Sequence, residues 1–249
     1  MTKQLIRFAL PALLAGCAGP VFAFHPMMTE DTRFLDRDGR QVEVGFEHSA
    51  SNEGTNSYSN TLTGEISYGL FKKVTLLLSA PWQGWRSNGI SESGPGDVSM
   101  EAKFNTGRKH GWRLALKPGF SMPAGNEAKS LGAGNGKVWL YGIAGRTEGP
   151  WEYYLNAGFL LNRNSLGENE NILKASAAAA YLVLPATRIL ADLAVETNAD
   201  KQSSTPPVNS LFGLAWSPYP TLDIDAGAKF GLNAPARSWG LLFGFTLRL

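Results

Sequence analysis

The chain has 249 residues, of which 43% are hydrophobic and 11% aromatic, and its formal net charge is only +2. This length allows one large domain or two small ones. Basic residues do not cluster among aromatic ones, so a nucleic-acid partner has little support. Outside the first residues, no apolar run reaches the roughly 18 to 20 residues that a membrane-spanning helix needs.

Residues 1–23 are typical of a signal peptide. Two basic residues precede an apolar stretch at residues 8–15, and an Ala-x-Ala-like site allows cleavage after Ala23. A second interpretation stays open, because residues 14–17 match the box at which lipoproteins are cleaved and lipidated, with Cys17 as the candidate lipidation site. Cys17 is the one cysteine of the chain, so no internal disulfide is expected. Either route takes the protein out of the cytoplasm.

A polar lead-in at residues 24–39 is followed by segments in which apolar and polar residues alternate. Strict alternation places the two kinds of residue on opposite faces of a β-strand. The pattern is clearest at the end of the chain, where six apolar residues from Trp239 to Leu249 alternate with mostly small or polar ones. The predicted strands are residues 41–48, 58–69, 73–82, 97–105, 111–122, 137–146, 151–162, 172–183, 187–197, 209–217, 221–232 and 238–249.

The connections between these strands alternate between long and short. Long connections are residues 49–57, 83–96, 123–136, 163–171 and 198–208, with a moderate one at 233–237. Short connections are residues 71–72, 106–110, 147–150, 185–186 and 218–220. Outer-membrane barrels have short periplasmic turns and longer external loops. An even number of strands that starts in the periplasm also returns the chain to the periplasm, as this count does.

Tryptophan residues gather near the predicted strand ends, as an aromatic girdle at each membrane interface requires. Girdle residues expected near the external ends are Trp82, Trp85, Trp139 and Trp239, and those near the periplasmic ends are Trp112, Trp151 and Trp216. A soluble β-sandwich is the alternative fold, but its core would hold tryptophan in mid-strand as often as at strand ends.

The predicted fold class is therefore all-β. We expect residues 40–249 to form a transmembrane antiparallel up-and-down β-barrel of about 12 strands in the outer membrane of a Gram-negative bacterium. Its expected partners are outer-membrane lipid, lipopolysaccharide and the barrel-assembly machinery.

Residues that could carry catalysis are scarce. His48 and Ser49 are neighbours on a predicted strand, so their side chains point to opposite faces and are poorly placed to form a nucleophile–base pair. The glycine-rich residues 132–136 lead into a strand, whereas a phosphate-binding loop leads into a helix. No pair of histidines or cysteines has metal-ligand spacing. We expect no enzymatic activity, no cofactor and no metal.

Charged residues occupy the rows opposite the apolar ones, so a barrel would direct them into its lumen. The candidate lumen-lining residues are Glu43, Glu47, Glu65, Asp97, Glu101, Lys103, Arg113, Lys117, Arg188, Asp192, Glu196, Asp223, Asp225 and Lys229. Two interpretations remain: a lumen closed by salt bridges, or a wet pore whose charges tune passage. Twelve strands lie between barrels filled by side chains and those with an open channel.

Several motifs suggest a family. They are His25-Pro26 with residues 29–32, then residues 67–70, 81–82, 94–99, 116–125, 191–193 and 225–233. With these motifs the chain resembles the outer-membrane transporter family of the phenol meta-cleavage degradation pathway, over almost its whole mature length. The resemblance implies an outer-membrane location and transport, but it assigns no ligand residue.

The leading functional hypothesis is a passive channel or transporter for small molecules, with hydrophobic or aromatic compounds suggested by the family name. The alternative is a structural or surface-interaction barrel with a closed lumen. The lead-in at residues 24–39 is too polar to cross the bilayer, and its mixed charged and aromatic content suggests a plug inside the lumen.

Overall fold

The computed structural model describes residues 25–51, 57–236 and 238–249. The predicted signal peptide and both processing sites, Ala23 and Cys17, lie outside these residues. In the part of the chain that is described, no helix has the length and apolar character to cross a membrane.

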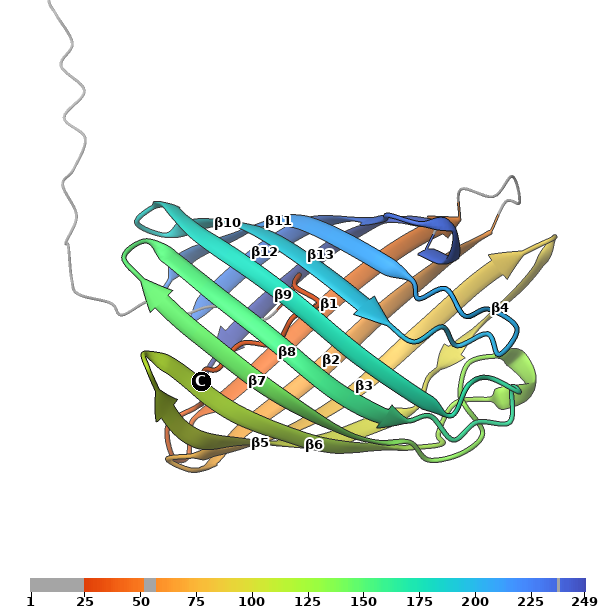
Figure 1. Ribbon diagram of the computed structural model, residues 1–249, viewed down its shortest axis with the longest axis horizontal. Helices are drawn as coiled ribbons and strands as arrows, with labels where there is room; N and C mark the ends of the chain where they lie inside the picture. Colours follow the sequence, from red (N-terminus) through yellow and green to blue (C-terminus); the bar gives the residue numbers. More distant parts are fainter. Residues whose placement is uncertain (1–24, 52–56, 237) are drawn as a thin grey trace, which may run out of the picture.

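The described chain is almost entirely β-sheet (Figure 1). The strands are β1 (Arg40–Ser51), β2 (Tyr58–Phe71), β3 (Val74–Ser87), β4 (Ile90–Pro95), β5 (Val98–Lys109), β6 (Trp112–Met122), β7 (Val138–Glu148), β8 (Trp151–Leu161), β9 (Asn171–Leu184), β10 (Thr187–Glu196), β11 (Val208–Tyr219), β12 (Leu222–Gly231) and β13 (Ser238–Arg248). Two short 3-10 helices, η1 (Glu127–Lys129) and η2 (Ala234–Ala236), lie in connections.

The sheet is antiparallel and closes on itself. Strands that follow one another in the sequence are neighbours in the sheet, apart from the exchange of β4 and β5 beside β3. The first and last strands, β1 and β13, pair in a continuous register from Gln41 opposite Arg248 to Ser51 opposite Ser238. The first half of β3 pairs with β5 and its second half with β4, so β4 and β5 share one position. The thirteen strands therefore form a barrel with twelve positions, which confirms the predicted fold class.

One connection differs from the expected long loop at residues 83–96. Strand β3 continues to Ser87 and returns as β4 through the two-residue turn Asn88–Gly89. Both turn residues have positive φ, 51° and 82°, as a type I′ hairpin turn requires. The Asn-Gly pair was a hairpin signal in the sequence. Among the described connections, the longer ones at residues 123–137, 162–170 and 197–207 lie together at one end of the barrel, and the short turns lie at the other (Figure 1).

The two faces of the wall differ as alternation predicts. On β13, Phe243 is 52% exposed on the outer face, whereas Leu242 and Thr246, which point inward, are buried. Other strands repeat this arrangement, with exposed outer residues such as Ile66 and Phe212. An apolar exterior around a polar interior is the arrangement that a bilayer requires, because lipid cannot hydrogen-bond to polar groups.

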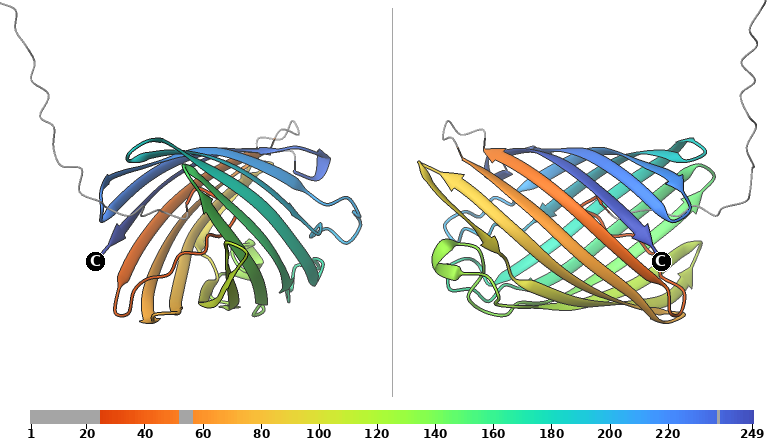
Figure 2. Two further views of the ribbon diagram at one scale, coloured as in Figure 1. Left: turned by 60° about the vertical axis from the view of Figure 1, so that its left-hand side comes forward. Right: turned by 180° about the vertical axis from the view of Figure 1, so that it is seen from behind.

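The first described residues do not belong to the wall. Residues 25–36, here called the N-terminal segment, run through the inside of the barrel before a turn leads into β1 (Figures 1 and 2). Thr29, Asp31 and Thr32 of this segment are each at most 2% exposed. The barrel thus has a core that is formed by its own N-terminal segment and the polar inner face of its wall.

Candidate functional site in the barrel interior

Asp192 on β10 holds one side of the N-terminal segment. Its Oδ2 accepts hydrogen bonds from the backbone amides of Met28 and Thr29, at 2.7 and 2.8 Å. Its Oδ1 accepts a third from the Thr29 hydroxyl at 2.7 Å. Nearer the start of the segment, His25 Nδ1 lies 2.5 Å from Asp225 Oδ1 on β12. Two of the predicted lumen carboxylates therefore bind the segment.

Lysines on the opposite wall bind the next residues of the segment. Lys117 on β6 forms ion pairs with Glu30 of the segment and with Glu101 on β5, the latter at 2.7 Å between Nζ and Oε2. Lys103 on β5 has Nζ 3.5 Å from both Glu30 Oε2 and Asp31 Oδ1. The segment thus spans the lumen between carboxylates on one wall and ammonium groups on the other.

Asp31 lies in the most enclosed part of this network. Burial alone would raise the pKa of its carboxyl, but the Arg33 guanidinium and the Lys103 ammonium outweigh burial and hold this pKa below its ordinary value. Arg33 Nε also donates to Asp31 Oδ2. The carboxylate is therefore charged at neutral pH and has charged partners, as a buried ion must.

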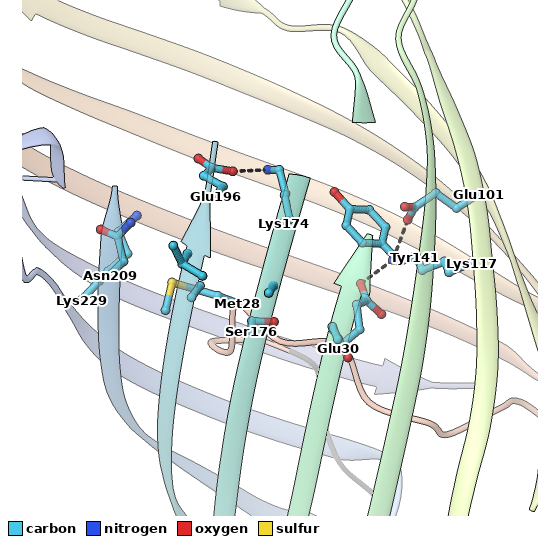
Figure 3. Close-up of a pocket in the computed structure, with 14 residues that line it drawn as sticks. Met28, Glu30, Glu101, Lys117, Tyr141, Lys174, Ser176, Glu196, Asn209 and Lys229 are labelled. Atoms are coloured by element: carbon cyan, nitrogen blue, oxygen red, sulfur yellow. Dashed lines mark hydrogen bonds and ion pairs between the residues drawn. The ribbon is translucent and has the colours of Figure 1, made fainter. Parts of the chain in front are cut away.

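A cavity of about 370 Å³ lies beside the segment, and we call it the central cavity (Figure 3). Its lining includes Met28 and Glu30 from the segment and residues of the eight strands β5 to β12. The lining residues labelled in Figure 3 are Met28, Glu30, Glu101, Lys117, Tyr141, Lys174, Ser176, Glu196, Asn209 and Lys229. The N-terminal segment contributes part of the cavity wall, so its position sets the size of the cavity.

A second cavity of about 470 Å³, here called the outer cavity, lies toward the long loops. It shares Glu101 and Tyr141 with the central cavity, so the two adjoin. One side of the outer cavity is the loop at residues 123–137, whose Leu131 is 2% exposed. Asp97 fixes this loop by accepting hydrogen bonds from the amides of Gly125 and Ala133, at 3.0 and 2.8 Å.

Other predicted lumen residues form pairs on neighbouring strands or across one intervening strand. Glu47 pairs with Lys229, and Glu196 pairs with Lys174 at 2.6 Å. Glu43 accepts a hydrogen bond from Thr246, at 3.2 Å. Asp223 forms an ion pair with Arg248 near the end of the last strand.

The last three predicted lumen residues have different surroundings. Glu65 accepts from the hydroxyls of Ser67 and Ser79. Arg188 is buried on β10. Arg113 lies apart from the cavities at the short-turn end, where it donates to the Thr147 hydroxyl at 3.1 Å in an exposed position.

Two tryptophans do not join the expected girdle. The indole of Trp139 donates to Glu101 Oε1 at 2.7 Å and lines the outer cavity, so it points inward. The indole of Trp85 donates to the carbonyl of Lys129 in the loop at residues 123–137. On each strand the opposite row of residues faces outward, as the exposed Trp82 on β3 and Leu140 on β7 show. The alternation in the sequence was therefore a better guide than position near a strand end.

The other five tryptophans occupy outer-face positions. Trp82, Trp151, Trp216 and Trp239 are between 37% and 57% exposed. Trp112 is half-buried on β6, on the same face as the exposed Leu116.

Sequence reasoning missed five polar residues of the central cavity wall: Tyr141, Asn156, Lys174, Ser176 and Asn209. Each occupies an inward position of a correctly predicted strand, so alternation was a signal for all five. His48 and Ser49 each have another partner: His48 Nδ1 lies 2.8 Å from Asn60 Oδ1, and the Ser49 hydroxyl donates to Glu47. Within the described residues, no three His, Cys, Asp or Glu side chains are grouped to hold a metal.

Comparisons with known proteins give one family and several similar folds. The family model described as "Putative MetA-pathway of phenol degradation" matches residues 66–249. An outer membrane channel from Pseudomonas putida is 16% identical over 88% of this chain and 98% of its own, with a TM-score of 0.75. No curated protein sequence matches the chain.

Two other solved structures share the architecture less closely. The translocator domain of the autotransporter NalP from Neisseria meningitidis is 12% identical over 88% of this chain and 91% of its own, with a TM-score of 0.52. The KdgM porin in complex with oligogalacturonate is 8% identical over 82% of this chain and 98% of its own, with a TM-score of 0.53. Identities this low support a shared fold alone.

Proposed function

The chain belongs to the family described as "Putative MetA-pathway of phenol degradation", and from this premise we propose that it is a passive channel for small molecules in the bacterial outer membrane. The family description favours hydrophobic or aromatic solutes. Transport of this kind needs no cofactor and no catalytic group. The apolar outer face supports a location in lipid, where the lipopolysaccharide of the outer leaflet would surround the long-loop end.

The observation that carries this proposal is the pair of adjoining cavities inside the barrel. Together they extend from the loop at residues 123–137 to the N-terminal segment, and both have polar as well as apolar lining. A barrel whose interior served only stability would gain from filling this space, because empty volume costs packing energy. Space of about 370 and 470 Å³ between charged walls supports passage of small, hydrated solutes.

The N-terminal segment favours a second candidate, a barrel that is closed at rest. The segment crosses the lumen beside the central cavity and is held at opposite walls by Asp192 and Lys117. We propose that the segment acts as a plug. It must move before a solute can pass through the barrel. A structural barrel with a permanently closed lumen would have the same contacts and no transport.

Swelling of proteoliposomes separates the two candidates. Purified protein is reconstituted into vesicles and diluted into sugars of increasing size, which do not cross lipid unaided. Faster swelling with the smallest sugars than with the largest supports a size-limited channel. If vesicles with protein swell no faster than protein-free vesicles, and deletion of residues 25–36 changes neither swelling nor single-channel conductance, the channel and the plug are both excluded.

A further inference from the structure

We propose that the central cavity selects uncharged small molecules that bear hydroxyl or similar polar groups, and that Tyr141, Ser176 and Asn209 recognise them. This inference rests on the proposed channel function and names its solute class. The volume of about 370 Å³ lies at the small end of the range for ligand pockets, which suits a molecule about the size of one substituted ring.

The charges of the central cavity already neutralise one another. Its lining contains three lysines and three glutamates: Lys117, Lys174, Lys229, Glu30, Glu101 and Glu196. Each lysine has a carboxylate partner: Lys117 has Glu30 and Glu101, Lys174 has Glu196, and Lys229 has Glu47. A ligand with one charge would have to break such a pair or remain unpaired in a confined space. Both outcomes cost free energy, so the cavity disfavours ions of either sign.

Neutral polar groups in the lining are free to bind a ligand. Within the part of the chain that the structure describes, the Tyr141 hydroxyl, the Ser176 hydroxyl and the Asn209 amide have no hydrogen-bond partner, and all three residues are half-buried. They come from β7, β9 and β11, and all three line the central cavity (Figure 3). Together they offer donors and acceptors from three directions, which a hydroxyl group can satisfy.

Gly158 sets the position of the Tyr141 ring. The two residues are directly paired between β7 and β8, and Gly158 is paired in turn with Lys174 on β9. A Cβ at position 158 would come within 2.6 Å of Tyr141 Cε1, so the ring lies over the glycine. The ring, Met28 and Ala194 give the cavity its apolar surface. The cavity therefore combines a ring face with neutral hydrogen-bonding groups, as binding of a hydroxylated ring requires.

Methyl NMR on the full mature protein in detergent micelles tests the selectivity. Protein with ¹³C-labelled methionine methyls is titrated with benzyl alcohol, benzoate and benzylammonium, which are similar in size but neutral, anionic and cationic. Met28 reports on the central cavity, whereas Met100 and Met122 are exposed on the outer face and report on micelle partitioning. We expect a saturable shift of Met28 with benzyl alcohol, at a midpoint at least about tenfold lower than with either ion.

Variants test the assigned residues. Tyr141→Phe and Asn209→Ala each remove one hydrogen-bonding group and should raise the benzyl alcohol midpoint by about 3- to 10-fold. Gly158→Ala leaves those groups in the chain but displaces the ring, and it should raise the midpoint as well. Tyr153→Phe is the matched control, because Tyr153 stacks on Trp151 at the outer face and should leave the midpoint unchanged. An unshifted Met27 resonance shows that the interior packing is intact, since Met27 packs against a buried cluster.

Equal midpoints for the three compounds would overturn the inference, as would a Met28 shift that only follows those of Met100 and Met122. Failure of the channel function has a different signature. In that case the Met28 titration and its variants behave as expected, while proteoliposomes do not swell. A protein that swells vesicles without binding preference retains the channel function and refutes the assigned selectivity.

Discussion

Replacing Asp192 with asparagine is expected to loosen the N-terminal segment from the barrel wall. The carboxylate accepts three hydrogen bonds from Met28 and Thr29, all between 2.7 and 2.8 Å. A hydrogen bond to a charged group contributes about 1.5–3 kcal/mol. Asparagine keeps one acceptor oxygen, but its amide nitrogen faces donors, and the contributions of neighbouring bonds do not add. We therefore expect docking to weaken by about 3 kcal/mol, or roughly 100-fold in the equilibrium constant.

Single-channel recording in planar bilayers measures this change as the fraction of time in a high-conductance state. The milder variant Thr29→Val removes only the hydroxyl bond and should increase that fraction about tenfold. Asp223→Asn is the control, because this buried carboxylate pairs with Arg248 and not with the segment. The reasoning is refuted if Asp192→Asn conducts like the wild type, or if Asp223→Asn opens the barrel equally.

On the outer face, Phe243→Arg is expected to destabilise the barrel by about 2–4 kcal/mol in urea titrations with phospholipid vesicles, whereas Leu247→Arg near the strand end should cost at most about 1 kcal/mol. Equal costs would contradict the proposed membrane position. At the long loops, Asp97→Ala removes two hydrogen bonds to the loop at residues 123–137, so limited proteolysis there should accelerate about tenfold or more; an unchanged rate would show that other contacts fix the loop. The lowered pKa of Asp31 gives a pH dependence: its contribution to docking is fully present above the ordinary value of 3.8 and is lost as the pH falls through the lowered pKa. The conductance of the Asp31→Asn variant should therefore exceed that of the wild type at pH 7. The two conductances should converge only below about pH 3.8.

Most of the fold was predictable because alternation is a local property of each strand. The predicted segments 151–162 and 238–249 match β8 (Trp151–Leu161) and β13 (Ser238–Arg248) within a residue. The predicted family is confirmed by the match over residues 66–249. The largest departure is β3, where reasoning from loop length took a hairpin extension for a loop. Its Asn88–Gly89 turn is a hairpin signal in the sequence that the assignment of a long loop left out of account.

Pairing inside the barrel was not predictable, because it depends on how distant strands meet. Alternation indicates that Lys229 and Glu47 both face inward, but their ion pair forms only because β13 closes against β1. Thr29 and Asp192 are likewise 163 residues apart in sequence. The charged rows therefore predicted a polar interior, whereas the choice of partners depended on the closing register and on the path of the N-terminal segment.

Glycines on the inner rows connect the wall to the N-terminal segment. Cβ atoms at Gly45 and Gly244 would lie 2.6 and 2.5 Å from the His25 ring. At Gly213 and Gly227 they would lie 2.9 and 3.0 Å from Pro26 Cγ. Contacts this short force a side chain to move, so the segment can dock only where the wall lacks side chains. Gly244 of the last strand, which the sequence alone explains as part of the inner row of a barrel, therefore also makes room for His25, together with Gly45 on β1.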